Sequence, residues 1–191
     1  MPKSRLEAFS DGVIAVIITI MVLEMKVPHG TDLAALVPLW PVFLAYVLSF
    51  IYVGIYWNNH HHLLHAVQRV NGSILWANLH LLFWLSLVPF VTDWMSENHF
   101  AALPVAAYGV VLLMSGFGFV MLTQCLVTIH GADSEIARRL RDDRKGKISV
   151  VIYAIAIPLA FVQWWLAFGL YVLVAAIWFV PDRRIEGHAA D

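Results

Sequence analysis

The sequence has 191 residues, of which 61% are hydrophobic and only 13% are charged, and its formal net charge is −1. Its mean hydropathy is +0.76, whereas a soluble domain has roughly 25% charged and about 45–50% apolar residues. A folded domain of this length cannot hide so much apolar surface from water. The composition therefore excludes a soluble enzyme and a disordered chain, and the single cysteine excludes a disulfide scaffold. We expect an all-α integral membrane protein.

Three stretches without a charged side chain have the length of single membrane crossings. They are Leu33–Trp57, Gly72–Thr92 and Phe100–Ile129, with 25, 21 and 30 residues. Because a helix of roughly 20 residues spans the hydrocarbon core, each stretch predicts one transmembrane helix. The third helix is long enough to be tilted or to extend beyond the bilayer.

A fourth stretch, Ile148–Pro181, has 34 uncharged residues, which is too long for one crossing. Gln163 and the two tryptophans after it lie at its middle, and such residues suit a membrane interface. The stretch therefore predicts two short helices, 148–162 and 165–180, joined by a tight turn. The alternative is one tilted helix that ends near Trp164 and continues as an interfacial segment.

The positions of lysine and arginine predict the orientation of these spans. With the N-terminal segment as the first of six spans, eleven of the twelve basic residues fall on one side and only Lys26 falls on the other. Because cytoplasmic loops carry an excess of lysine and arginine, we expect both termini in the cytoplasm. The basic segment 138–147 also contains Asp142 and Asp143, so we interpret it as a solvated connector rather than a patch that binds nucleic acid or lipid. No repeat or linker divides residues 1–191, which predicts a single domain.

The first span is too polar to face lipid alone. Only 12 uncharged residues separate Asp11 from Glu24, and they form about 18 Å of helix. Since an ionised side chain deep in lipid costs several kcal/mol, protein or water must cover this helix. It is therefore either a central helix that the other five surround or a helix that lines an aqueous path.

The apolar side chains of this helix gather on one stripe. At about 100° per residue, the stripe contains Phe9, Val16, Ile20, Leu23 and Val27, with Thr19 on its flank. Periodicity alone favours ordinary helix packing. The alternative is a ring of aliphatic side chains around a symmetry axis, because a narrow apolar constriction gates ions by dewetting.

Several motifs in the first three spans resemble one known family. The segment 5–11 fits Arg-x-x-x-Phe-Ser-Asp at the start of a first transmembrane helix, and the match continues at Gly12–Val16, Leu23–Glu24, Val27–Pro28, Tyr56–His61, Leu75–Leu79 and Ser86–Phe90. In these motifs the chain resembles the endosomal and lysosomal potassium-channel family and its bacterial homologues. The resemblance is strong over spans one to three, whereas spans four to six match in pattern only.

The resemblance implies a homotetramer of six-helix subunits, with the four copies of helix one around a central pore. Such a channel lacks the glycine-rich carbonyl filter of ordinary potassium channels, and no such stretch occurs here. The resemblance places the hydrophobic constriction at Val16, Ile20 and Leu23. Thr19 either offers its hydroxyl to a partly dehydrated cation or bonds to its own helix, and Glu24 near the outer mouth attracts cations. We thus expect passive, potassium-preferring conduction across a bacterial inner membrane, with potassium as permeant ion and no cofactor.

A polar network is expected near the cytoplasmic end of helix one. Trp57 and His60 share a face of the second helix, level with Asp11, so we expect them to bond Ser10 or Asp11 in a buried network that every member must satisfy. The expected motif and network residues are Arg5, Phe9, Ser10, Asp11, Trp57, His60 and Asn78, the last of which enters through the resemblance.

The nine histidines leave a second interpretation open, a proton- or metal-coupled transporter that uses His60, His61 and His65. The last two have the i, i+4 spacing of a helical ligand pair. A closed zinc site needs three or four ligands, and the only acidic residue between Glu24 and Asp93 is Asp32, on the expected opposite side. We therefore expect no bound metal. No nucleophile–base pair or phosphate-binding loop is apparent, so we expect no enzyme.

Overall fold

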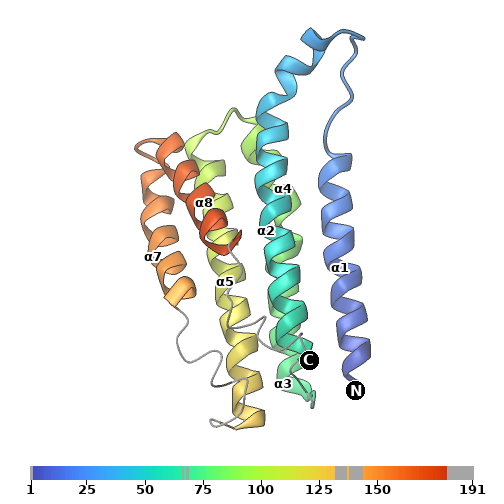
Figure 1. Ribbon diagram of the computed structural model, residues 1–191. Coiled ribbons are helices and arrows are strands. Elements are labelled where there is room, and N and C mark those ends of the chain that lie inside the picture. The colour runs from blue at the N-terminus through green and yellow to red at the C-terminus, as the bar shows by residue number, and fades with distance from the viewer. Residues whose placement is uncertain (1, 66, 68, 132–136, 138–143, 180–191) are drawn as a thin grey trace.

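The computed structural model describes residues 2–65, 67, 69–131, 137 and 144–179, and their regular secondary structure is entirely helical (Figure 1). These helices form six rods, since two of the rods each consist of two consecutive helices. Six is the number of spans predicted from the sequence. Most of the predicted connector 138–147 lies outside the described residues. All of the basic residues after position 179 lie outside them as well. In chain order the helices are α1 (Lys3–Leu23), the 3-10 helix η1 (Leu33–Leu39) leading into α2 (Trp40–His65), α3 (Gly72–Ser86) leading into α4 (Val88–Glu97), α5 (Ala102–His130), α7 (Arg144–Leu159) and α8 (Trp164–Phe179).

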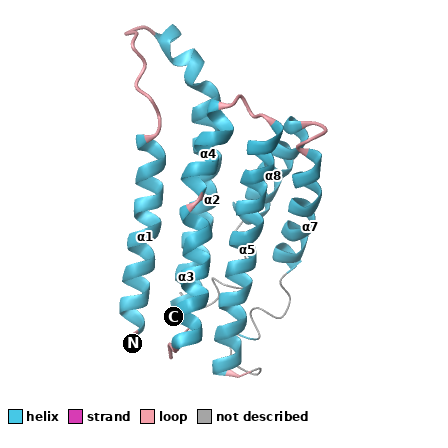
Figure 2. Cartoon of the chain, turned by 180° about the vertical axis from the view of Figure 1, so that it is seen from behind, coloured by secondary structure: helices cyan, strands magenta, loops and turns pink. Residues whose placement is uncertain are grey.

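The rods lie side by side along one common direction (Figure 2). Within the described residues, α1, η1 with α2, α3 with α4, and α5 are each long and apolar enough to cross a membrane, and α8 is a shorter apolar helix. The chain is therefore a multi-pass membrane protein.

The C-terminal stretch forms two helices, as the sequence predicts. A turn at residues 160–163 separates α7 from α8, and the backbone N–H groups of Val162 and Gln163 both donate to the carbonyl of Leu159. The alternative of one tilted helix is wrong. Pro158 lies in the last turn of α7 and removes one of the N–H donors that a continuous helix needs.

Two predicted spans differ from the observed helices at prolines. The stretch expected as one helix over 72–92 breaks at Leu87 and continues as α4, where Pro89 occupies the first turn, a position that tolerates the missing N–H. The second span begins as a 3-10 helix that contains Pro38 and whose N-terminus the Asp32 side chain caps. It then extends past the predicted end at Trp57 to His65.

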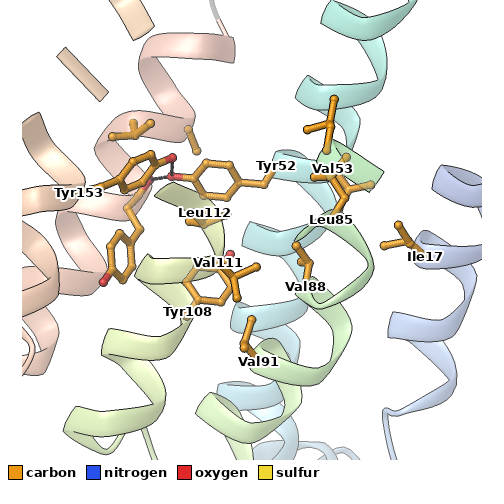
Figure 3. Close-up of a cluster of buried hydrophobic side chains, with 14 of the residues drawn as sticks. Ile17, Tyr52, Val53, Leu85, Val88, Val91, Tyr108, Val111, Leu112 and Tyr153 are labelled. Atoms are coloured by element: carbon orange, nitrogen blue, oxygen red, sulfur yellow. Dashed lines mark hydrogen bonds between the residues drawn. The ribbon is translucent and has the colours of Figure 1, made fainter. Parts of the chain in front are cut away.

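Buried tyrosines join α2 to the C-terminal helices (Figure 3). The Tyr52 hydroxyl donates to the carbonyl of Tyr171 (2.6 Å) and accepts from the hydroxyl of Tyr153 (3.2 Å). The Tyr108 hydroxyl lies 3.0 Å from Ser49 Oγ. Since a buried hydroxyl is costly without a partner, these bonds fix how α5, α7 and α8 sit against α2.

Helix α1 lies at one edge of the bundle, with α7 at the other (Figures 1 and 2). It packs mainly on α2, α3 and α4, and one face of it is buried there: Leu6, Ser10, Ile14, Ile17 and Met21. The interpretation of α1 as a central helix that the other five surround is therefore wrong for a single chain. Its opposite face is left without cover by the described part of the chain.

The close approach of α8 to α5 at Gly109 generates a first prediction. A Cβ at this position would overlap the hydroxyl of Tyr171 and lie 2.8 Å from its Cζ, and that hydroxyl bonds the carbonyl of Val105 (3.1 Å). We expect Gly109→Ala to destabilise the fold by about 1–3 kcal/mol, the usual cost of overpacking. Thermal unfolding in detergent measures this. The control is Gly169→Ala, where a Cβ would meet nothing within 4 Å; an equal effect of both variants would contradict the prediction.

Candidate pore-lining helix and its polar anchor

The stripe predicted on α1 is the uncovered face of the helix. Phe9 is 50% exposed, Val16 54%, Ile20 41% and Leu23 79%, and Val27 beyond the helix is also exposed. Packing among the residues that the structure describes therefore does not explain the stripe. The remaining alternatives for a helix that carries Asp11 at one end are cover from other copies or an aqueous path.

Thr19 lies beside this stripe and is exposed. Its hydroxyl donates to the carbonyl of Val16 (2.9 Å), which is the bond to its own helix that the sequence left open. A hydroxyl oxygen that donates its proton still accepts through its lone pairs, so the expected contact with a cation stays a prediction.

A buried hydrogen-bonded chain crosses from α2 through α3 to α1. His60 Nε2 lies 2.7 Å from Asn78 Oδ1, and Asn78 Nδ2 donates to Ser10 Oγ (3.0 Å). The Ser10 hydroxyl in turn donates to the carbonyl of Leu6 (2.9 Å). Since Asn78 uses its amide nitrogen toward Ser10, its oxygen accepts from His60, and this requires the proton on His60 Nε2. All three side chains are buried, and each has at least one hydrogen-bond partner in this network.

A second hydrogen bond joins α2 to α1 beside this buried network, between more exposed side chains. The indole Nε1 of Trp57 donates to Asp11 Oδ1 (3.0 Å), so neighbouring residues Ser10 and Asp11 are tied to α3 and α2 respectively. Arg5 is exposed, and its guanidinium makes no hydrogen bond or ion pair with the part of the chain that the structure describes. The sequence missed that Asn78, rather than Ser10, is the direct partner of His60.

At the opposite end, an ion pair ties the segment after α1 to the end of α4. Lys26 Nζ donates to Glu97 Oε1, and this hydrogen bond together with the carboxylate charge raises the pKa of Lys26. Glu24 lies exposed in the same segment. The sequence did not predict this pairing, because nothing in the spacing of residues 26 and 97 indicates that they meet.

A groove of about 850 Å³ runs between α1 and the α3–α4 segment. Stripe residues form one wall and the break before Pro89 forms the other, so the groove is mostly apolar. Two carboxylates, Glu24 and Asp93, lie in its lining. The lining also includes Val16 and Ile20 from α1, and Ser86, Pro89 and Phe90 from the opposite wall.

Comparison with known proteins decides the family. The family model "Endosomal/lysosomal potassium channel TMEM175" matches residues 5–89. A protein of a Chryseobacterium species named as a potassium channel is 55% identical over 186 residues, which cover 97% of both chains. The chain belongs to the TMEM175 family.

The similarity to a solved structure extends over nearly the whole fold. The crystal structure of a lysosomal potassium-selective channel TMEM175 homolog from Chamaesiphon minutus superposes with a TM-score of 0.81 at 29% identity, covering 95% of this chain and 97% of that one. A chicken protein named as an endosomal/lysosomal proton channel TMEM175 is 30% identical over 152 residues, or 68% of this chain and 30% of that protein. The resemblance read from the motifs is confirmed, and the chain has a channel role.

The histidine cluster of this TMEM175 family member divides into two parts. His60 is buried in the hydrogen-bonded chain, whereas His61 and His65 are exposed, with ring centroids 6.2 Å apart. Among the described residues, no group of three or more histidine, cysteine, aspartate or glutamate side chains is placed to hold a metal ion. Among the described residues, the structure therefore places no third metal ligand beside His61 and His65, the pair whose spacing suggested a transporter.

The position of Asn78 between His60 and Ser10 generates a second prediction. Asn78→Ala removes the acceptor of the buried His60 Nε2 and the donor to Ser10 Oγ, which keeps its bond to the Leu6 carbonyl, and we expect a loss of about 1–3 kcal/mol in unfolding free energy. The measurement is chemical or thermal unfolding in detergent. The matched control is Asn58→Ala, because Asn58 is exposed at the surface of α2. A loss no larger than that of the control would mean that the buried chain does not stabilise the fold.

Proposed function

We propose that the chain is a potassium-preferring cation channel, a single six-helix channel domain over residues 1–191, whose pore is lined by α1 from four copies. The observation that carries this proposal is the division of α1 into two faces. One face holds Ser10 in a buried hydrogen-bonded chain, and the stripe with Val16 and Leu23 is uncovered at the edge of the bundle. An arrangement that buries the stripe between copies also shields the polar end of α1 from lipid.

In such a tetramer each stripe residue forms a ring of four. Val16, Ile20 and Leu23 follow one another at steps of four and three residues, so their rings stack about 6 Å and about 4.5 Å apart along the axis. Apolar rings this close form one continuous constriction, in which water and ions are unstable when the passage is narrow. We propose these rings as the hydrophobic gate.

Polar groups flank the proposed constriction. Four copies of Glu24 form an acidic ring that concentrates cations at the outer mouth, and Thr19 presents hydroxyl oxygens beside Ile20. The excess of lysine and arginine on one side of the spans supports cytoplasmic termini in a bacterial inner membrane. In this proposal Asp11, Trp57 and the motif residues hold α1 in place rather than contact ions.

The permeant ion is the first property to measure. We expect the purified chain in liposomes to pass potassium faster than sodium and to exclude chloride, because the proposed mouth is acidic. A pH-sensitive dye in the same vesicles measures proton flux, because the chicken relative is named as a proton channel. Chloride flux equal to potassium flux, or proton flux without potassium flux, would overturn the proposal. Saturable uptake that collapses when His60 or His61 is replaced would favour the transporter instead.

Substitution of the constriction tests the role of α1 directly. We expect Ile20→Asn or Leu23→Asn to wet the apolar rings and to raise basal potassium flux by about tenfold, which corresponds to a barrier lowered by about 1.4 kcal/mol. The potassium-to-sodium flux ratio should fall as well. The control is Val151→Asn, which places the same amide on the exposed face of α7. Unchanged flux in both α1 variants would remove these residues from the narrow pore.

A further inference from the structure

One ammonium group and three carboxylates meet where α1 ends on the expected outer side. Lys26 is the only one of the twelve lysines and arginines that falls on that side of the spans. Its hydrogen bond to Glu97 and the charge of Glu97 raise its pKa most, and the charges of Asp93 and Glu24 add to this effect. Three carboxylates therefore compete for one ammonium group, and Glu97 holds it.

Burial does not fix the partner of Lys26. The side chain of Lys26 is 79% exposed and that of Glu97 is 43% exposed, and a lysine ammonium lies on a flexible four-carbon stem. Glu24 precedes Lys26 by two residues, and Asp93 precedes Glu97 by one helical turn on α4. Competition among nearby carboxylates thus sets the pairing, and loss of Glu97 leaves Glu24 and Asp93 as the partners within reach.

The segment that carries Lys26 borders the proposed mouth of the pore. Leu23 and Val27 lie on either side of it in the sequence and are 79% and 82% exposed, and both belong to the stripe on the uncovered face of α1. In four copies, four ammonium groups lie near the proposed ring of Glu24 carboxylates. An ammonium group that pairs with Glu24 cancels the negative charge with which such a ring attracts cations.

We infer that Glu97 is a positioning residue that holds the Lys26 ammonium on α4, so that the Glu24 ring keeps its negative charge for passing cations. This inference rests on the proposed function, since the charge of Glu24 matters to conduction only beside an ion pathway. Glu97 touches no ion in this scheme and acts through Lys26. The pair thereby helps to determine both the conductance at low ionic strength and the preference for cations over anions.

The same pair also ties the segment after α1 to the end of α4, and a purely mechanical role gives a different expectation. If only the tie matters, removal of either partner has the same effect. If the position of the charge matters, loss of Glu97 frees an ammonium group beside Glu24, whereas loss of Lys26 leaves the mouth more acidic. The two single variants then change conduction in opposite directions.

Single-channel conductance in planar bilayers tests the inference, because it measures the open pore regardless of how often the pore opens. We expect Glu97→Gln to lower the potassium conductance about threefold in about 0.01 M salt, where exposed charges act over about 30 Å. In about 1 M salt, where they act over about 3 Å, the variant should match the unmodified chain. The potassium-to-chloride permeability ratio should also fall at low salt.

Three further variants separate the position of the charge from other effects. Lys26→Gln should raise the low-salt conductance, since it leaves Glu97 as an additional negative charge. The double variant Lys26→Gln with Glu97→Gln should return to the unmodified value, because no freed ammonium group remains. The matched control is Asp32→Asn, which removes an exposed outer carboxylate that caps η1 instead of pairing with Lys26, and it should lower the conductance less than Glu97→Gln.

Several outcomes overturn the inference while the channel stands. They are an unchanged low-salt conductance in Glu97→Gln, a fall that persists in about 1 M salt, a fall in Lys26→Gln, and an equal fall in Asp32→Asn. Absence of potassium current from the unmodified chain instead removes the proposed function and the inference together. Because Lys26→Gln is expected to act in the opposite direction by itself, misfolding of Glu97→Gln still leaves a test.

Discussion

The hydrogen bonds from His60 through Asn78 to Ser10 are the constraint on which the arrangement of α1 depends. In an apolar bundle a buried hydroxyl, amide and imidazole are stable only when each satisfies the others. This requirement fixes the rotation of α1 about its own axis: with Ser10 turned inward, the stripe of Phe9, Val16 and Leu23 must face outward. The hydrogen bonds from His60 through Asn78 to Ser10 therefore determine which side chains of α1 the described residues leave uncovered.

Helices α5, α7 and α8 are bonded to α2, and α2 in turn is bonded to α1. Tyrosine hydroxyls join α2 to α5, α7 and α8, and α2 also carries Trp57 and His60. One face of α2 thus packs on the C-terminal helices while another holds the start of α1. This division places the stabilising contacts on the buried side of the fold, and the described residues leave the stripe of α1 uncovered at the opposite edge.

The sequence predicted the number of rods because charge-free length is the dominant signal in a membrane, where backbone groups must bond within each helix. A helical period placed Val16, Ile20 and Leu23 on one stripe, but periodicity alone favoured ordinary helix packing, whereas the described residues leave the stripe uncovered. The sequence missed the break at Leu87 and the 3-10 turn around Pro38, because both are still apolar and uncharged. It also missed the groove and the Lys26–Glu97 pair, which arise only when segments distant in sequence come together.

The Lys26–Glu97 pair makes the position of the segment after α1 sensitive to the salt concentration of the medium. Both side chains reach water, and dissolved salt weakens attraction between exposed charges. The stretch that bears Glu24 is consequently held more firmly in a dilute medium than in brine. Rising salt concentration thus loosens one connection at this end of the bundle, whereas the buried hydrogen bonds of the interior are screened much less.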